Sequence, residues 1–499
     1  MIDGHFEGFL TEKQELHETR KELTKGGRCM YIFCTISLTK LTHLPGAIAQ
    51  VTIDILSDVA LLRVFDFCVD NPRIYTWYTL VHVCRKWRGI VFGSPRRLDL
   101  RLHCNTSTPV RKTLDVWPPL PIVISSVGHN RRGVDNIIAA LEHSDRICQV
   151  DLFYYPSSHF EKVLAVMQRP FPTLTSLWLR LKDETVPVDP ELFLGGSAPR
   201  LETLFLYHIP FPGLPKLLSS ATHLAHLTLW KIPHSGYFSP DAIATCLFVL
   251  TRLECLDIAF ESPQSRPEPT RRRPPPHTRA VLPVLTKFQF KGVDKYLEDF
   301  VAWIEVPLLH NLAIDFFHQL IFDTSQLSQF ISRTPKLKTH NKARVVFSKG
   351  VSVTLPQKPD GRLYLGISCR QRDWQLSSLV QVCSSSIPQA LISTVEHLYI
   401  SESSQLPWQD DIENSQWLEL LHPFTAVKDL YVSPEFVPRI LPALQELTGE
   451  RVTEVLPALQ NLFFDEPHAS GPVQDITVRF VDARQRAGHP IGVSRWEKE

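Results

Sequence analysis

A short apolar pattern recurs along most of the chain. Segments that begin at Leu174, Leu201, Leu224 and Leu253 follow the pattern L-x-x-L-x-L, with isoleucine at the last place of the fourth. Weaker versions begin at residues 285, 309, 395, 427 and 459. Because apolar and polar residues alternate over the second half of each segment, each segment predicts a strand with one buried face.

The segments between these strands have apolar residues at helical spacing. Helices are expected over 213–221, 241–250, 295–304 and 325–333. Most strand starts are 23 to 32 residues apart, and a strand followed by a helix at such a period is typical of leucine-rich repeats. We therefore expect an α/β repeat fold, a leucine-rich-repeat-like solenoid of strand–helix units that share one core. The alternative is an ordinary α/β domain in which the pattern recurs by chance.

The repeats depart from the usual pattern. The asparagine that normally follows L-x-x-L-x-L in leucine-rich repeats is absent, and Lys182 and Ile209 stand at the corresponding places. The ladder that such asparagines make with backbone groups cannot form in the usual way. We therefore expect irregular units with longer loops.

Residues 51–94 predict a small all-α domain ahead of the repeats. Ser57 can cap a helix that begins at Asp58 and stops at an Asn-Pro pair. A second, continuous helix is expected from about Thr76 as far as Ser94. The apolar stripe of that helix consists of Trp77, Leu80, Cys84, Trp87 and Val91.

Further apolar residues lie outside this stripe, among them Val59, Leu62, Val81 and Val83. Two or three short helices in about 45 residues cannot bury all of them, because domains of that size rarely build a sufficient core. An apolar helical surface that needs cover is typical of a protein–protein site. A partner is therefore expected on these helices.

The same residues resemble an F-box of the kind found in many fungal proteins. The resemblance is carried by Leu56-Ser57-Asp58-Val59, by Leu61-Leu62-Arg63-Val64-Phe65 and, most specifically, by Val83-Cys84-Arg85-Lys86-Trp87. Ser57 stands where the family usually has a proline. As a whole, the chain is similar to F-box proteins with irregular leucine-rich repeats.

The resemblance implies a role and a set of contacts. F-box proteins are the substrate-recognition subunits of SCF-type cullin ubiquitin ligases. Their F-box binds the SKP adaptor, which joins a cullin scaffold, and their repeats bind the protein to be ubiquitinated. By position, the residues that would face or support the adaptor are Leu56, Ser57, Val59, Leu62, Leu80, Val83, Cys84 and Trp87.

Two alternatives stay open for this segment. Cys84 and Trp87 could instead fill the internal core, because buried cysteine and tryptophan are common core residues. The chain as a whole could be a non-catalytic leucine-rich-repeat scaffold that binds a protein without any ubiquitin-ligase role.

No pattern in the sequence identifies the client protein. In solenoids the binding surface is often the strand face or the loops at one rim. Aromatic residues dominate the energetics of interfaces, so Phe205, Tyr207 and Trp230 are the candidate client-binding residues. The alternative is that these rings pack between repeats.

Composition narrows the classes of function. The formal net charge of +1 argues against a dedicated nucleic-acid binder, and the apolar run at 29–39 is too short to cross a membrane. Ten cysteines without a C-x-x-C pair or zinc-ligand spacing predict free thiols, no metal site and a cytoplasmic or nuclear protein. The sequence has no phosphate loop, nucleophile elbow or zinc-binding helix motif, so we expect no catalytic residue and no cofactor.

These observations predict an order of parts along the chain. The expected parts are a poorly ordered lead-in (1–50), the F-box-like domain (51–94), a linker with the first strands that cap the solenoid (95–145), the solenoid itself (146–470) with a disordered Pro/Arg-rich insertion (261–279), and a C-terminal cap and tail (471–499) whose last residues (489–499) fray.

Overall fold

The computed structural model divides the chain into two compact units, Met1–Leu100 and Arg101–Glu499. The residues that the structure describes are 56–69, 76–94, 97–98, 100–104, 110–127, 131–182, 193–211, 213–263, 279–319, 321–338, 340–357, 361–369, 372–403, 413–447, 449–464 and 472–496. The predicted lead-in at 1–50 and most of the insertion predicted at 261–279 lie outside these ranges.

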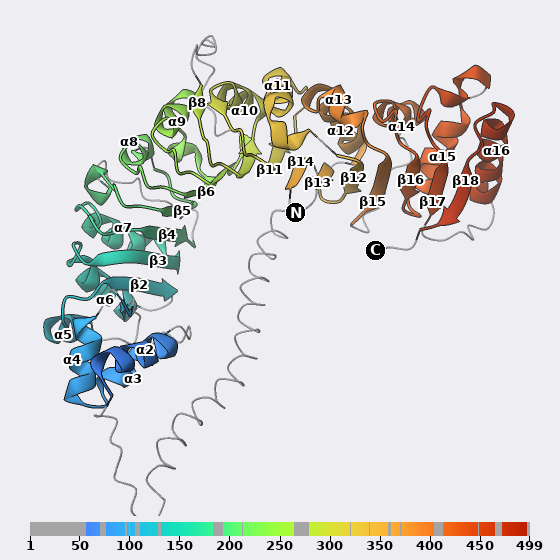
Figure 1. Cartoon of the computed structure of the whole chain (residues 1–499). Helices are drawn as coiled ribbons and strands as arrows, with labels where there is room; N and C mark the ends of the chain where they lie inside the picture. The colour runs from blue at the N-terminus through green and yellow to red at the C-terminus, as the bar shows by residue number, and fades with distance from the viewer. Residues whose placement is uncertain are drawn as a thin grey trace, which may run out of the picture. The chain divides into compact units, whose positions relative to one another are not determined.

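Three short helices form the described part of the first unit between residues 56 and 94: α2 (Asp58–Val69), α3 (Thr76–Val81) and α4 (Arg85–Gly93) (Figure 1). The hydroxyl of Ser57 accepts a hydrogen bond of 3.3 Å from the backbone N–H of Ala60, as expected of a residue that caps a helix. The predicted start of α2 is therefore confirmed.

The sequence predicted one continuous helix from Thr76, and this prediction is wrong. The first helix ends at Val81, a turn follows, and α4 starts only after Cys84. Cys84 has an extended backbone, and its Sγ accepts a hydrogen bond of 3.5 Å from the backbone N–H of Trp87. A residue that caps the second helix cannot also continue the first, so the helix breaks there.

In the described part of the second unit, sixteen strands form one sheet (Figure 1). Neighbouring strands are parallel, except that β13 runs antiparallel to both β12 and β14. In sheet order the strands are β1 (Leu102–Cys104), β2 (Ile122–Val127), β3 (Ile147–Tyr155), β4 (Ser176–Leu181), β5 (Thr203–Tyr207), β6 (His226–Ile232), β7 (Cys255–Phe260), β9 (Lys287–Gly292), β11 (Asn311–Phe317), β14 (Gly361–Ser368), β13 (Val351–Gln357), β12 (Lys342–Phe347), β15 (His397–Glu402), β16 (Asp429–Val432), β17 (Asn461–Phe464) and β18 (Gly492–Arg495). A separate parallel pair joins β8 (Ala280–Val281) to β10 (Ile304–Glu305).

The helices of the second unit follow the strands and lie along one side of the sheet (Figure 1). They are α5 (Val110–Val116), α6 (Arg131–Leu141), α7 (Ser157–Val166), α8 (Leu214–Leu218), α9 (Pro240–Leu247), α10 (Asp294–Val301), α11 (Ser325–Arg333), α12 (Arg372–Ser386), α13 (Gln389–Ile392), α14 (Asn414–Leu421), α15 (Val437–Gln445) and α16 (Pro472–Arg486). Short 3-10 helices lie at η2 (Phe193–Gly196), η3 (His234–Gly236), η5 (Pro335–Leu337) and η6 (Gly449–Thr453).

The leucines of the repeated pattern build the core between strands and helices. Leu177, Leu204, Leu227 and Leu256 are direct neighbours in successive strands, and each is 0% exposed. Burying one such side chain stabilises the fold by about 1.5–3 kcal/mol, so each added unit extends one shared core. Every recurrence of the pattern lies at a strand, which begins two residues after the pattern does. The predicted α/β repeat fold is confirmed.

An antiparallel insertion interrupts the repeats and was not predicted. Between β11 and β15 the chain forms β12, β13 and β14, and β14 rather than β12 pairs with β11. This segment lacks L-x-x-L-x-L, which is why the strand starts jump from residue 309 to residue 395. The sequence did carry a signal for this hairpin, because Ser-Lys-Gly and Pro-Asp-Gly flank a segment in which Val351, Val353 and Leu355 alternate with polar residues, and such turns favour hairpins.

Neighbouring units are also joined by a buried carboxylate. Glu298 of α10 is 7% exposed and accepts hydrogen bonds of 2.7 Å from the backbone N–H groups of Gln326 and Leu327. These two groups belong to the first turn of α11, where N–H groups have no partner within the helix. Burial raises the pKa of Glu298, and the two backbone hydrogen bonds oppose that rise. The side chain therefore caps the helix of the next unit.

The chain's last described residues are ordered, contrary to the expected fraying of 489–499. β18 pairs in parallel with β17, and the backbone N–H of Trp496 donates to the carbonyl of Phe464 at 2.6 Å. The edge of a sheet offers unpaired backbone groups, so a final strand can add there. The preceding helix α16 is joined to this end of the sheet by Arg484, which is 1% exposed.

Replacing Arg484 with methionine is expected to lower the stability of the C-terminal end by about 2 kcal/mol, because it leaves buried carbonyls without donors. The guanidinium donates to the carbonyls of Val452, Leu456 and Leu459 at 2.9, 3.3 and 3.2 Å. Arg486→Met, on an exposed position of the same helix, is the matched control. Hydrogen exchange of α16 and β18 measures the effect, and equal protection in the two variants would contradict it.

Candidate functional site

The helices α2–α4 bury a small core of their own. Trp87 is 7% exposed, and its ring meets that of Phe65 edge-on at 4.8 Å. The ring of Trp77 meets that of Phe92 at 6.3 Å. Among the residues predicted to face or support the adaptor contact, Leu80 and Trp87 thus lie in this core, which for Trp87 is the alternative that the sequence left open.

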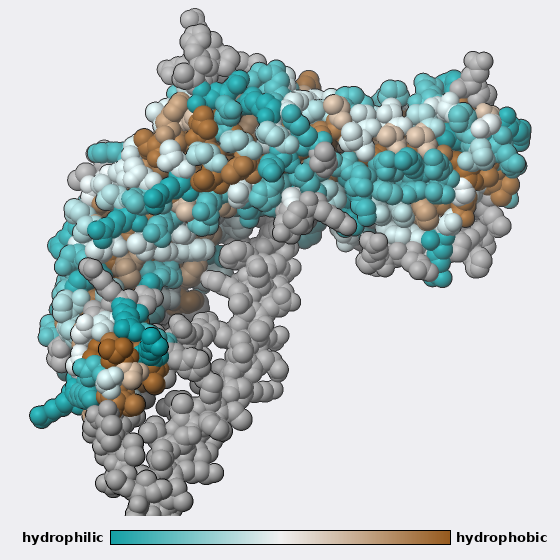
Figure 2. All heavy atoms as spheres, viewed as in Figure 1, coloured by the Kyte–Doolittle hydropathy of each residue, from teal (hydrophilic) through white to brown (hydrophobic). Residues whose placement is uncertain are grey.

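Other predicted adaptor residues lie at the surface of these helices or of the segments that join them. Val59 is 61% exposed, Val83 is 53% exposed, and Leu56 is 40% exposed. Ser57 is exposed as well, and Leu62 and Cys84 are half-buried. Figure 2 shows apolar surface over these helices. Exposed apolar side chains on such a small unit are typical of a site that a partner covers.

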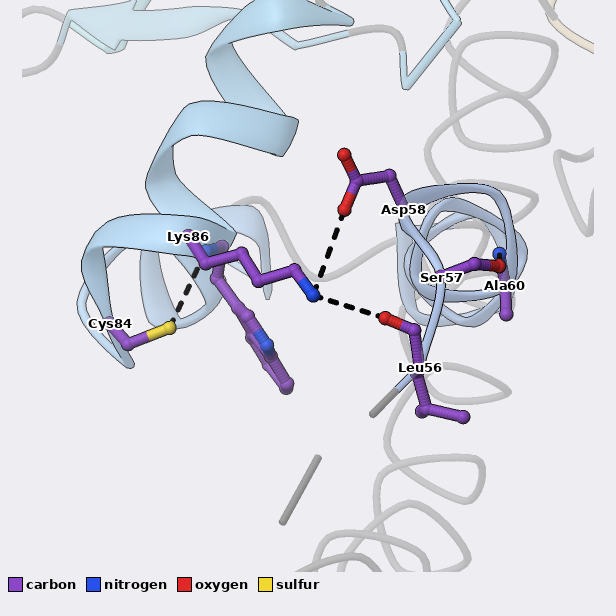
Figure 3. Close-up of polar contacts among 7 residues, drawn as sticks. Leu56, Ser57, Asp58, Ala60, Cys84 and Lys86 are labelled. Atoms are coloured by element: carbon purple, nitrogen blue, oxygen red, sulfur yellow. Dashed lines mark hydrogen bonds and ion pairs between the residues drawn. The ribbon is translucent and has the colours of Figure 1, made fainter. Parts of the chain in front are cut away.

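A lysine of the most specific motif holds the start of α2 against α4. The ammonium of Lys86 donates to the carbonyl of Leu56 at 3.1 Å and lies 3.8 Å from the carboxylate of Asp58 (Figure 3). Arg88 of the same helix donates to the carbonyl of Val81 at 3.0 Å. The motif residues therefore have three different structural roles: Trp87 fills the core, Cys84 caps α4, and Lys86 joins α4 to the start of α2.

The sheet of the second unit has a second face, opposite its helices, which we call the strand face. The side chains that alternate with the buried leucines project from it. Phe205 lies there, stacked on Trp178 of the neighbouring strand at 4.7 Å and tilted towards Trp230 at 6.1 Å. Phe205 is only 8% exposed, whereas Tyr207 and Trp230 are half-buried. The predicted client residues therefore lie together, with Phe205 packed between its neighbours.

A cation lies between aromatic rings beside these residues. The guanidinium of Arg180 lies 4.3 Å from the ring centres of both Tyr154 and Tyr207. The ammonium of Lys231 also lies over the ring of Tyr207, 5.5 Å from the ring centre. Contacts of this kind stabilise a surface while keeping its cations near solvent.

Two irregular positions shape this row. The register shifts at Tyr154 in β3 and near Lys231 in β6, and both residues have positive φ, 58° and 49°. Non-glycine residues rarely adopt that conformation, and bulges of this kind re-aim side chains. Sequence reasoning did not find Tyr154 or Arg180, because a bulge has no signature in the L-x-x-L-x-L pattern.

A second aromatic row lies on the strand face further along the sheet. Tyr399, Tyr431 and Phe463 are direct neighbours in β15, β16 and β17, and their rings stack at 4.2 and 4.4 Å with interplanar angles of 9° and 8°. Trp496 packs against the first two at 5.9 and 5.8 Å. The sequence carried a signal for this row, because each ring occupies the same place between two apolar residues of the repeated pattern.

Two carboxyl groups of the strand face have altered acidity. Asp257 of β7 is 7% exposed, and burial raises its pKa to about 7, although Trp230 and Lys287 favour the ionised form. Burial also raises the pKa of Asp315, whose Oδ1 accepts a hydrogen bond of 3.4 Å from the hydroxyl of Tyr364. Because the pKa of Asp257 is about 7, this carboxyl group is only partly ionised near neutral pH.

Comparison with known proteins adds little to this description. No family model matches the chain, and no curated protein matches it. One similar solved structure is the leucine-rich repeat-containing protein LegL7 from Legionella pneumophila, at 10% identity and a TM-score of 0.26, over 76% of this chain and 97% of that one. At that TM-score the likeness supports no argument about this chain.

Among the described residues, no helix is long and apolar enough to cross a membrane. No group of three or more His, Cys, Asp or Glu side chains among these residues could hold a metal ion. Seven cysteines of the described part of the chain are free thiols: Cys84, Cys104, Cys148, Cys246, Cys255, Cys369 and Cys383.

Proposed function

We propose that this chain is the substrate-recognition subunit of an SCF-type cullin ubiquitin ligase. In this proposal α2–α4 act as an F-box that binds the SKP adaptor, and through it a cullin scaffold. The repeats bind the protein to be ubiquitinated, and the chain itself performs no catalysis. The observation that carries the proposal is the exposure of Leu56, Val59 and Val83 on helices whose sequence resembles an F-box.

The substitution of proline by Ser57 is compatible with this role. A proline at that place would preset the backbone ahead of the helix. Ser57 instead caps α2 through its hydroxyl and accepts the N–H of Leu61 with its carbonyl at 2.9 Å. Lys86 adds a further contact at the same end of α2. The start of the helix is thus held without the proline.

The residues predicted to face or support the adaptor contact divide into surface and core residues. Val59, Val83 and Leu56 supply the apolar contact, since their side chains are already at the surface. Leu80 and Trp87 support it from the core, and Cys84 supports it by capping α4. An interface of this kind buries its apolar residues at the centre and leaves polar ones at the rim.

Changing Val59 or Val83 to aspartate is expected to abolish co-purification of the SKP adaptor while the chain stays folded. A charge at the centre of an apolar interface must be desolvated without a partner, which costs several kcal/mol. The measurement is co-expression of the full chain with the adaptor of a fungal cell, followed by affinity purification. Val478→Asp is the matched control, because Val478 is 52% exposed on α16 of the other unit.

The alternative function is a non-catalytic repeat scaffold without a ligase role. It predicts that the folded full chain does not retain the adaptor at all, or retains it equally in the Val59, Val83 and Val478 variants. Either result would reject the receptor proposal.

A further inference from the structure

Basic side chains gather on the strand face between β9 and β12. They are Lys287 and Lys291 of β9, Arg362 of β14, and Lys342 and Arg344 of β12. Each alternates along its strand with residues that are buried against the helices, so all of them project from the same face. Arg344 is exposed and the other four are half-buried.

The register aligns three of these cations in one row across the strands. Lys287 pairs with Asn311, Asn311 pairs with Arg362, and Arg362 pairs with Pro356. The antiparallel register of β12 and β13 places Lys342 on the far side of Pro356. Cations thus alternate with neutral positions. Because neighbouring strands are about 4.8 Å apart, successive cations of this basic row start from backbones about 10 Å apart.

The acidic groups of the surrounding strand face offset this charge only in part. Asp315 pairs with Lys291 in the register, and Asp257 interacts electrostatically with Lys287, while burial raises the pKa of both carboxyl groups. Asp429 of β16 is already engaged, since it lies 2.8 Å from the Nδ1 of His397 and accepts a hydrogen bond of 2.7 Å from Asn461. The basic row therefore favours an anionic partner.

The aromatic rings beside the row argue against two other kinds of partner. Tyr431 stacks between Tyr399 and Phe463, so both of its faces are covered. Lys342 and Arg344 lie over the ring of Tyr399 at 5.9 and 5.7 Å. Nucleic-acid bases need exposed ring faces on which to stack, and so do cationic ligands. Stacked rings instead present edges, which carry partial positive charge, and the two tyrosines add hydroxyl donors.

We propose that the basic row and the adjoining tyrosines bind an acidic segment of the client protein, in which Asp or Glu recurs at every third residue of an extended chain. In a polyproline II conformation, residues i and i+3 lie on the same side, about 9.3 Å apart. That period matches the spacing of the cations in the row. The inference rests on the proposed receptor function, because it names the chemistry of the client that the repeats would bind.

The test uses the full chain purified with the SKP adaptor. The probe is a fluorescent peptide that repeats Glu-Pro-Ala, and binding is measured by anisotropy at low and high salt. Two further probes are the same peptide with glutamine for glutamate and a single-stranded uridine oligonucleotide of equal charge. The variants are K342E/R344E and K287E/R362E. The matched control is K336E/K338E, which changes the charge equally at exposed positions after α11.

The acidic peptide is expected to bind saturably to the wild-type complex, more weakly at high salt because screening shortens the range of the attraction. Each strand-face variant should weaken binding about 10-fold or more, which corresponds to the loss of about 1.4 kcal/mol or more. The control variant K336E/K338E shows whether a change in net charge alone weakens binding. The glutamine peptide shows whether the peptide backbone binds without the carboxylates. Melting curves should be the same for all variants.

The inference is overturned if the acidic peptide does not bind, if K336E/K338E weakens it as much as K342E/R344E, or if the oligonucleotide binds more tightly at the same residues. The last result would identify a nucleic-acid partner instead. Retention of the adaptor is read from the same preparations. A wild-type chain that retains the adaptor but does not bind the peptide rejects only this inference, whereas a wild-type chain that binds the peptide but does not retain the adaptor rejects the ligase role.

Discussion

Truncating Trp87 to alanine is expected to unfold the α2–α4 helices, and adaptor binding should disappear with the fold. The ring is 7% exposed and packs against Phe65 at 4.8 Å. Removing a buried tryptophan costs about 3–5 kcal/mol. A small helical unit has a total stability of only about 5–15 kcal/mol, usually at the low end for its size. Most of that stability would therefore be lost.

Hydrogen exchange separates this effect from a loss of contact with the partner. Amides of α2 and α4 should lose protection in Trp87→Ala, while the strands of the second unit keep theirs. Val83→Ala is the control, because Val83 is 53% exposed and exposed substitutions change stability by about 0.5 kcal/mol or less. Full protection of α2 in Trp87→Ala would show that the tryptophan serves the partner surface and not the core.

Replacing Asp257 with asparagine is expected to remove a pH dependence of stability between pH 5 and pH 8. In the folded chain burial raises the pKa of Asp257 from 3.8 to about 7. The folded state thus holds a proton that the unfolded state has already released above about pH 4. The contribution of Asp257 to the free energy of unfolding is fully present below about pH 4, falls as the pH rises from about 4 to about 7, and is lost above about pH 7.

The size of the expected change in stability follows from the shift in the pKa of Asp257. Between pH 5 and pH 8 the wild type should lose about 2–3 kcal/mol more stability than Asp257→Asn, at about 1.36 kcal/mol per pKa unit. Urea denaturation at the two pH values measures the difference. Asp241→Asn, at a half-buried position of α9 in the same unit, is the control. Parallel pH profiles of the wild type and Asp257→Asn would mean that the carboxyl group is ionised in the fold.

The two surfaces of the proposed receptor differ in how they are built. The adaptor surface is a few exposed aliphatic side chains on short helices. The strand face draws its residues from many successive strands, so it extends as far as the sheet does. An extended client segment can contact several units at once, and each contact can be weak.

Part of the strand face was predictable and part was not. Tyr399, Tyr431 and Phe463 occupy equivalent places in the repeated pattern, so their alignment follows from the sequence once the register is known. Arg180 and Tyr154 meet only because a bulge in β3 turns one side chain towards the other. The basic row depends on β14 pairing with β11. From the order of the strands along the chain, β12 and not β14 would be expected beside β11.

The amino-acid sequence by itself determined the repeat fold, because spacing of leucines at two residues within a strand and at 23 to 32 residues between strands leaves few ways to bury them. It also located the apolar helices within 51–94. Only the tertiary structure decided which of their residues are core and which are surface. Helix α4 begins at a cap formed by Cys84, which turns Trp87 inward onto Phe65 and leaves Val83 in the exposed turn. Periodicity cannot distinguish a buried face from one that awaits a partner, because both are apolar and the difference lies in the neighbouring elements.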